Sequence, residues 1–140
     1  MKPELVMVGP MMPHVMEALD SDFTVHRLWE SADRAGLLKE VGGRVRAVAT
    51  SGHLGADAAM IDALPKLEII SCYGVGVDAI DLKHAAKRGV IVTNTPDVLN
   101  DDVANMAIAL LLATTRQICA GDRYVRAGKW LKEAMPLTHA

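Results

Sequence analysis

The chain has 140 residues, and 51% of them are hydrophobic, which is enough to bury one ordinary core. Fifteen basic and seventeen acidic side chains are spread without blocks and leave a formal net charge of −2. This balance excludes both the cationic face of a nucleic-acid-binding protein and an acidic tail, so we expect a soluble globular protein with no nucleic-acid partner.

The two cysteines, Cys72 and Cys119, have neither metal-ligand spacing nor the density of a disulfide framework. We therefore expect reduced thiols, a cytoplasmic location and no metal site. The longest apolar run, residues 106–113, falls short of the ~20 residues that cross a bilayer. The N-terminal apolar run is broken by glycine and proline, unlike a signal peptide. No membrane partner is expected.

The first half of the chain alternates strand patterns with helix patterns. Ser31 or Asp33 can cap the second helix, and Gly42 and Gly43 can stop it. The expected elements, in order, are a strand at residues 5–8, a helix at 14–19, a strand at 23–28, a helix that carries Leu37, Leu38 and Val41, a strand at 45–50 and a helix at 58–64.

The next stretch combines a strand with a glycine loop. Residues 69–73 are a strand that could be buried on both faces. Gly74 and Gly76 can take positive φ and place no side chain over the backbone, so the N–H groups around Val75 are free to converge on an anion. A small carboxylate would suit this loop. Asp81 can cap a helix at residues 82–88, which Gly89 ends.

The same glycines also fit the dinucleotide fingerprint G-x-G-x-x-G/A, with Ala79 in the third position. In that fingerprint the helix begins inside the motif and points its N-terminus at the pyrophosphate. Here the expected helix begins too late. The acidic residue required about 20 positions later could only be Asp97, which lies beyond a proline. We therefore prefer the carboxylate loop.

Residues 90–93 form the fifth strand, and residues 94–97 turn the chain away. Strands separated by single helices imply right-handed crossovers, and we expect an α/β, flavodoxin-like parallel five-stranded sheet with helices on both faces. Ligands bind beyond the carboxyl ends of such strands, where residues 51–54 and 74–77 fall. A phosphoacceptor receiver domain is excluded because Gly9-Pro10 and Thr50-Ser51 stand where its acidic residues belong.

After residue 99 the pattern changes. Asn100 can cap a long helix that runs to about Gln117, with Asp101 and Asp102 in its first turn. Residues 106–113 are apolar on every side, and such a helix is normally buried all round. We expect it to lie between two bodies. A more polar helix should follow at residues 122–130.

Three motifs in this order carry a family resemblance: G-V-G-V-D-A-I-D at residues 74–81, K-R-G-V-I-V-T-N-T-P-D-V-L at 87–99 and D-D-V-A-N at 101–105. Together they resemble the N-terminal part of a D-2-hydroxyacid dehydrogenase, most similar to the hydroxypyruvate/glyoxylate and hydroxyphenylpyruvate reductases. The resemblance implies a substrate-binding (catalytic) domain at residues 1–99. Residues 100–140 would be the interdomain helix and arm leading to a nucleotide-binding domain outside the sequence, so the chain looks truncated.

The resemblance also implies residue roles. The backbone N–H groups of Val75 and Gly76, with Gly74 beside them, would hold the substrate carboxylate. The nicotinamide cofactor, NADP or NAD, would lie near Val75, Asn100 and Val103. The catalytic arginine, its acidic partner and the acid/base histidine of the family belong to the missing part, and none maps onto this chain. The segment expected to line the substrate pocket is Ser51, Gly52, His53 and Leu54.

The implied reaction is reduction of a small 2-oxo acid, such as glyoxylate or hydroxypyruvate, to a D-2-hydroxy acid with NAD(P)H. We expect the 140-residue chain alone to be inactive and the complete protein to be a homodimer, with Trp130 and Leu131 as a candidate contact. The alternative is a non-catalytic binding or regulatory module of the same fold. His53 is the one histidine in a ligand-side loop, where a solvated or locally hydrogen-bonded side chain is the simpler interpretation.

Overall fold

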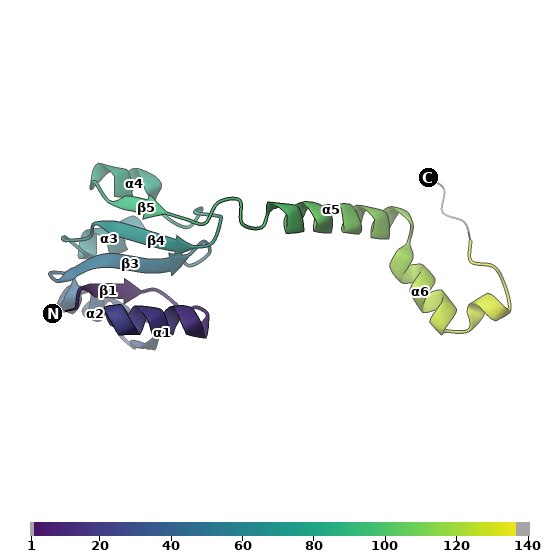
Figure 1. Cartoon of the computed structure of the whole chain (residues 1–140), viewed down its shortest axis with the longest axis horizontal. Coiled ribbons are helices and arrows are strands. Elements are labelled where there is room, and N and C mark those ends of the chain that lie inside the picture. The colour runs from purple at the N-terminus through teal and green to yellow at the C-terminus, as the bar shows by residue number, and fades with distance from the viewer. Residues whose placement is uncertain (1, 137–140) are drawn as a thin grey trace. The chain divides into compact units, whose positions relative to one another are not determined.

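The computed structural model describes residues 2–136, which form two compact units that divide between Pro96 and Asp97. The first unit is a parallel five-stranded sheet with the order β2-β1-β3-β4-β5 (Figure 1). This is the order of flavodoxin-like doubly wound sheets, and it confirms the expected α/β fold. The strands are β1 Glu4–Met7, β2 Thr24–Arg27, β3 Val45–Ser51, β4 Ile69–Tyr73 and β5 Ile91–Thr93.

Helices cover both faces of the sheet, as expected, but to different extents. In Figure 1, α1 (Pro13–Asp22) lies in front of the sheet, and α2 (Arg34–Val41) and α3 (Ala58–Ala63) lie behind it. The rear core also includes Ala85 from α4 (Leu82–Lys87) and sheet residues such as Val48 and Ile70. In front, α1 packs over β1 and its neighbours, whereas Tyr73 of β4 and Ile91 of β5 stay 46% and 62% exposed.

Three helices begin at aspartates, of which Asp33 and Asp81 were expected as caps and Asp57 was not. The side-chain oxygens of Asp33, Asp57 and Asp81 each accept a hydrogen bond from the backbone N–H three residues later, at 2.8, 2.8 and 2.9 Å. Each bond satisfies an N–H that has no partner within its helix. The cap of α2 is therefore Asp33 rather than Ser31.

Several predicted boundaries in this unit differ from the structure by one residue or more, and the first helix and the second strand show the differences with a clear physical reason. The first helix begins at Pro13, because proline needs no N–H partner in the first turn, and it runs past residue 19 to Asp22. The second strand ends at Arg27, and the buried Leu28 opens a short 3-10 helix, Leu28–Glu30.

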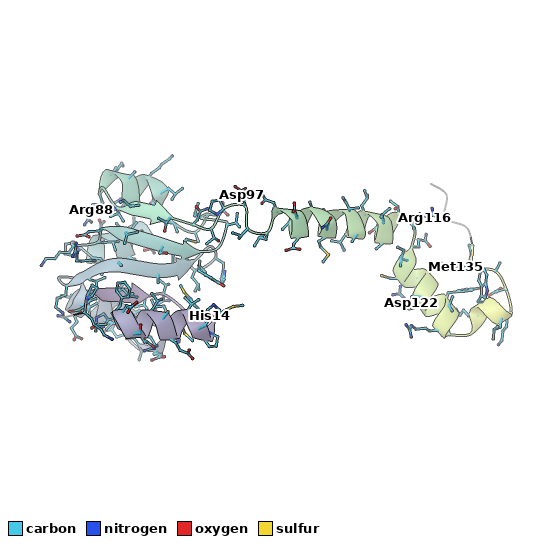
Figure 2. The ribbon with its side chains drawn as sticks, in the orientation of Figure 1. His14, Arg88, Asp97, Arg116, Asp122 and Met135 are labelled. Carbon is cyan, nitrogen blue, oxygen red and sulfur yellow. The ribbon has the colours of Figure 1, made fainter. Side chains whose placement is uncertain are left out.

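The second unit contains α5 (Asn100–Thr115), α6 (Ile118–Arg126) and a 3-10 helix, Lys129–Leu131. Asn100 is not the cap of α5. Its side-chain amide donates to the Asp97 carboxylate at 2.8 Å, and Leu99 holds the cap position without a side-chain bond. Asp97 precedes α5 and Arg116 follows it (Figure 2).

The long helix also ends earlier, and the polar helix starts earlier, than the sequence indicates. Gln117 has a left-handed backbone, φ 50°, which no helix can continue through, so it separates α5 from α6. The two helices are bent by 59° at this break. Together they have the length and hydropathy of a broken membrane span, but within residues 2–136 no single helix is long and apolar enough to cross a bilayer.

Candidate functional site

Two loops lie side by side at the carboxyl edge of the sheet. The first, residues 51–56, follows β3, and the second, residues 74–81, follows β4, which pairs with β3 up to Ser51 and Tyr73. Ala56 joins them: its N–H donates to the Ala79 carbonyl at 3.2 Å, and its carbonyl accepts from the Asp81 N–H at 3.0 Å. The structure therefore brings together the two segments that the sequence analysis expected at the ligand side.

Glycine allows the two loops to approach this closely. A Cβ on Gly52 would collide with the Gly76 carbonyl oxygen, and a Cβ on Gly55 would collide with that of Ala79. Gly55 also has a left-handed backbone, φ 64°. The Gly55 carbonyl accepts a hydrogen bond from the buried Thr50 hydroxyl at 2.7 Å, which holds the loop in place.

The backbone of the glycine loop differs in one detail from the expectation. Gly74 has a positive φ of 151°, but Gly76 does not, so the prediction for Gly76 was wrong. A Cβ on Gly76 would lie 3.2 Å from the Asp78 carboxylate, a flexible group that could move aside. Neither the backbone conformation of Gly76 nor the space around its Cα therefore requires glycine in the absence of a ligand.

The carbonyl groups of Gly74 and Val75 are held by residues that follow β5. The Gly74 carbonyl accepts from the Thr95 N–H at 3.0 Å, and the Val75 carbonyl accepts from the Asn94 side-chain amide at 2.8 Å. The N–H groups of Val75 and Gly76 have no hydrogen-bond partner within residues 2–136. Val75 is half-buried and Gly76 is exposed. Two neighbouring free donors at an open surface can bind a small anion.

Cys72 contributes a third contact from beneath the loop. Its buried Sγ lies 3.4 Å from the Gly76 carbonyl and can donate to it, so the residue does more than fill the core. Burial raises the pKa of the Cys72 thiol, which keeps the donor proton in place. The contacts of Asn94, Thr95 and Cys72 were missed by the sequence analysis. The expected flavodoxin-like sheet could have indicated the contacts of Asn94 and Thr95, because it places β5 beside β4. The residues after β5 then meet the loop after β4.

The other predicted pocket residues lie around the first loop. Ser51 ends β3, and its hydroxyl is 3.4 Å from Nδ1 of His53, so this exposed histidine has a local partner. The Leu54 side chain fits against Gly9, where a Cβ would collide with it. Together with Gly52, these residues lie at the expected edge. Their role as a pocket lining stays a prediction.

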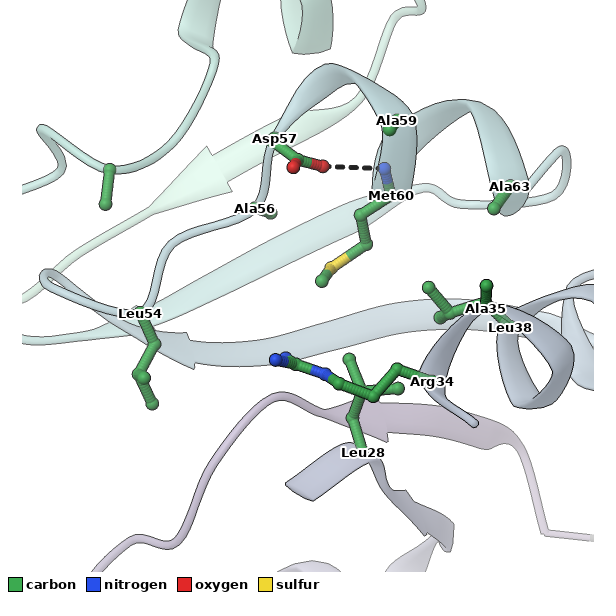
Figure 3. Close-up of a pocket in the computed structure, with 11 residues that line it drawn as sticks. Leu28, Arg34, Ala35, Leu38, Leu54, Ala56, Asp57, Ala59, Met60 and Ala63 are labelled. Carbon is green, nitrogen blue, oxygen red and sulfur yellow. Dashed lines mark hydrogen bonds between the residues drawn. The ribbon is translucent and has the colours of Figure 1, made fainter. Parts of the chain in front are cut away.

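Leu54 also borders a separate groove of about 440 Å³ between α2 and α3 (Figure 3). Arg34 extends from the start of α2 across this groove, and Met60 and Leu38 contribute its apolar walls. The residues that line the groove do not include Val75 or Gly76. The groove is therefore distinct from the free amide pair.

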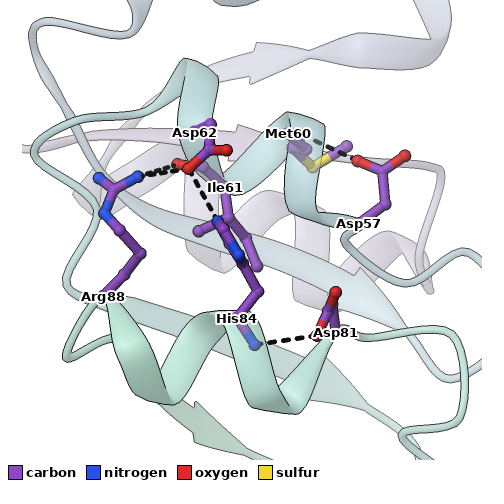
Figure 4. A network of polar contacts seen from close by, with 7 residues as sticks. All are labelled: Asp57, Met60, Ile61, Asp62, Asp81, His84 and Arg88. Atoms are coloured by element: carbon purple, nitrogen blue, oxygen red, sulfur yellow. Dashed lines mark hydrogen bonds and ion pairs between the residues drawn. The ribbon is translucent and has the colours of Figure 1, made fainter.

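The described histidines other than His53 lie away from the glycine loop in sequence and in their contacts. His14 is exposed on α1 (Figure 2). His26 is 2.8 Å from Glu4, and His84 is 2.8 Å from Asp62 in a network that joins α3 and α4 (Figure 4). His139 lies outside the described residues. Among residues 2–136, no group of three or more potential ligands could hold a metal ion.

The structure also argues against the dinucleotide interpretation of the glycine motif. The helix that follows, α4, begins at Leu82, six positions after Gly76, and has only 6 residues. A dinucleotide fingerprint needs a helix that starts inside the motif. The described residues therefore do not form a dinucleotide site by themselves. Asn100 and Val103, the other predicted cofactor neighbours, belong to the second unit, and their role stays a prediction.

Comparison with known proteins identifies the family of this fold and loop. The model of the D-isomer specific 2-hydroxyacid dehydrogenase catalytic domain matches residues 5–133. The chain belongs to this family. Within the D-isomer specific 2-hydroxyacid dehydrogenases, it is 47% identical to hydroxyphenylpyruvate reductase of Plectranthus scutellarioides, over 90% of this chain and 40% of the relative. It is 44% identical to glyoxylate/hydroxypyruvate reductase A of Arabidopsis thaliana, over 96% of this chain and 43% of the relative.

Solved structures of the same dehydrogenase family agree with the fold. A 2-hydroxyacid dehydrogenase from Ketogulonicigenium vulgare is 50% identical, with a TM-score of 0.90 over 99% of this chain and 44% of the other. An NADPH-dependent glyoxylate/hydroxypyruvate reductase from Sinorhizobium meliloti, solved with NADP and malonate, is 41% identical, with a TM-score of 0.79 over 99% of this chain and 42% of the other. The chain thus spans less than half the length of these relatives.

Proposed function

We propose that this chain binds the carboxylate of a small 2-oxo acid, such as glyoxylate or hydroxypyruvate, for reduction to the D-2-hydroxy acid with NADPH or NADH. The observation that carries the proposal is the pair of free N–H groups on Val75 and Gly76, in a loop where the Gly74 and Val75 carbonyls already accept hydrogen bonds from Thr95 and Asn94. Hydrogen bonds from backbone N–H groups to a carboxylate are charge-assisted and stronger than neutral ones.

The similar proteins support the substrate class. The two curated relatives described above are reductases of hydroxyphenylpyruvate and of glyoxylate or hydroxypyruvate, and each of these substrates is a small acid with an oxo group. This favours an enzyme over the alternative, a non-catalytic binding or regulatory module of the same fold. The identity of the preferred oxo acid depends on residues around Leu54 and beyond the amide pair.

The nicotinamide cofactor would supply the hydride. Residues 2–136 hold no helix that starts inside a glycine motif, so we assign this chain only an edge of the cofactor site, at Val75, Asn100 and Val103. The substrate-side residues bind and orient the carboxylate. We accordingly propose that the 140-residue chain binds the acid but does not turn it over.

We also propose a cytoplasmic location, supported by the free state of both cysteines, and a homodimer for the complete protein.

The test is a titration of the ¹⁵N-labelled chain with oxalate, a carboxylate that cannot be reduced, followed by NMR. We expect saturable shifts of the Val75 and Gly76 amide signals, and no such shifts with glycolaldehyde, which lacks the carboxylate. Gly76→Val should weaken binding far more than Val75→Ala, because the new side chain occupies the space above the amides. Equal, small effects of the two substitutions would contradict an amide cradle, and glyoxylate reduction by this chain would contradict its proposed inactivity.

A further inference from the structure

The orientation of the free N–H groups of Val75 and Gly76 is fixed through the carbonyls of the same peptide groups. A peptide group is planar and trans, so its C=O and its N–H point in opposite directions. The Gly74 carbonyl and the Val75 N–H belong to one such group, and the Val75 carbonyl and the Gly76 N–H belong to the next. A contact that fixes either carbonyl therefore also fixes the N–H on the opposite side of the same plane.

Both carbonyls are fixed by the residues that follow β5. This strand pairs with β4 through Ser71 and Thr93, so the chain after Thr93 runs beside the glycine loop. The Thr95 N–H donates to the Gly74 carbonyl at 3.0 Å, and the Asn94 side-chain amide donates to the Val75 carbonyl at 2.8 Å. Hence Thr95 directs the N–H of Val75, and Asn94 directs the N–H of Gly76.

The two contacts differ in a way that matters for function. The Thr95 contact uses the backbone and extends the pairing of β4 with β5, so it is part of the fold. The Asn94 contact uses a side chain, which makes no other hydrogen bond in the described part of the chain. Asn94 is exposed, so removing its side chain leaves no cavity in the core.

We propose that Asn94 is a positioning residue, which aims the Gly76 N–H at the substrate carboxylate by holding the Val75 carbonyl. The proposal rests on the proposed carboxylate-binding function of the loop. Without the Asn94 amide, the peptide group between Val75 and Gly76 is free to rotate, since glycine follows it and imposes little restriction on the backbone. The Gly76 N–H would then point at the ligand only part of the time.

The Gly76 carbonyl has a contact of its own, and comparing it with the Asn94 contact shows which residue is better suited to mutation. The Gly76 carbonyl is held by the Cys72 thiol at 3.4 Å, which orients the peptide group after the amide pair. Cys72 lies in the core, however, and its replacement would disturb packing and loop geometry together. The Asn94 side chain can be removed while the sheet, Cys72 and the Thr95 contact remain.

The experiment compares Asn94→Ala with the wild-type chain in the oxalate titration. A hydrogen bond to a charged group contributes enough that losing its alignment should weaken binding ~10-fold. The ligand-induced shift should fall more at the Gly76 amide than at the Val75 amide, because Thr95 still directs the latter. Asn94→Gln, which keeps the amide donor on a longer side chain, should restore part of the binding. Thr93→Ala, at the preceding position and with no side-chain hydrogen bond among the described residues, is the matched control and should bind as wild type.

The outcomes separate the two proposals. If wild-type Val75 and Gly76 do not respond to oxalate, the proposed function fails. If the wild type binds and Asn94→Ala binds within about twofold of it, with an equal shift at Gly76, the positioning role is overturned. If Asn94→Ala lowers the urea midpoint, Asn94→Gln decides: regained oxalate binding and a regained Gly76 shift support positioning. Regained stability without regained binding overturns it.

Discussion

At the scale of single residues, short-range hydrogen bonds determine where helices begin. Asp81 lies between the glycine loop and α4, and its carboxylate accepts from the His84 N–H at 2.9 Å. Asp78, three positions earlier, has a carboxylate that accepts no hydrogen bond among the described residues and lies near Gly76. The two aspartates therefore differ in role although they share one loop.

Asp81→Ala should lower the free energy of unfolding by ~1 kcal/mol, because a backbone N–H at the start of α4 loses its partner. Urea denaturation followed by circular dichroism measures the change. Asp78→Ala is the matched control and should stay within about 0.5 kcal/mol of the wild type. Equal losses in the two variants would mean that Asp81 acts through loop charge and not as a helix cap.

At the scale of elements, a charged network joins two short helices. The Asp62 carboxylate of α3 lies 2.8 Å from Nε2 of His84 and 2.9 Å from a guanidinium nitrogen of Arg88, on and just after α4 (Figure 4). Arg88 also donates to the Ile61 carbonyl at 3.3 Å. The His84 hydrogen bond, followed by that of Arg88, lowers the pKa of Asp62 below its ordinary value.

This shift predicts a pH-dependent contribution to stability. A carboxylate whose pKa is lower in the folded state stabilises the fold above its unfolded pKa, near 4, and that contribution is lost as the pH falls through the folded pKa. The difference in urea midpoint between wild type and Asp62→Asn should therefore be largest near neutral pH and shrink in acid. A difference that is constant from pH 7 to pH 3 would contradict the assignment.

The long helix α5 poses a different problem at the same scale. Its side chains Ile108, Leu110, Leu111 and Leu112 are 56%, 60%, 62% and 51% exposed. A fully buried leucine contributes ~1.5–3 kcal/mol relative to an exposed one, so several of them facing water favour any arrangement that covers them. The apolar pattern of residues 106–113 predicts a helix buried on all sides, and the described residues do not cover it.

We expect the 140-residue chain to self-associate through α5. Light scattering should report a mass above that of a monomer, and the double variant Ile108→Glu with Leu111→Lys should shift the chain toward the monomer. A matched double variant on the polar side of α6, Asp122→Lys with Arg126→Glu, keeps the i,i+4 ion pair in reversed order and should leave association unchanged. A monomeric wild type in which α5 amides are well protected from exchange would contradict the prediction.

At the scale of the whole molecule, the hydrophobic core and the candidate carboxylate site belong to one unit. Both clusters of buried residues, and both loops of the site, come from residues before Pro96. The second unit has no buried large side chain among its described residues. Cooperative unfolding should therefore be a property of the first unit.

A chain that ends at Pro96 should fold and unfold with a urea midpoint close to that of the 140-residue chain, and it should bind oxalate with the same affinity. The physical reason is that burial of apolar side chains is the main stabilising contribution, and the first unit contains it. Circular dichroism and the Val75 and Gly76 amide shifts provide the measurements. Failure of the shorter chain to fold would mean that the second unit completes the core.

The sequence by itself determined the elements that depend on local chemistry. The caps at Asp33 and Asp81, the strand at residues 69–73 and the alternation of strands and helices follow from side-chain periodicity and from hydrogen bonds a few residues apart, so they can be read in order along the chain. The loop at residues 74–76 as a candidate anion site follows in the same way from two glycines directly after a strand.

Only the tertiary structure decided how that loop is held. Asn94 and Val75 are 19 positions apart, and Gly52 and Gly76 are farther still, so their contacts depend on the strand order and not on local pattern. Local propensity is weak at such positions, and the packing of distant segments decides their conformation.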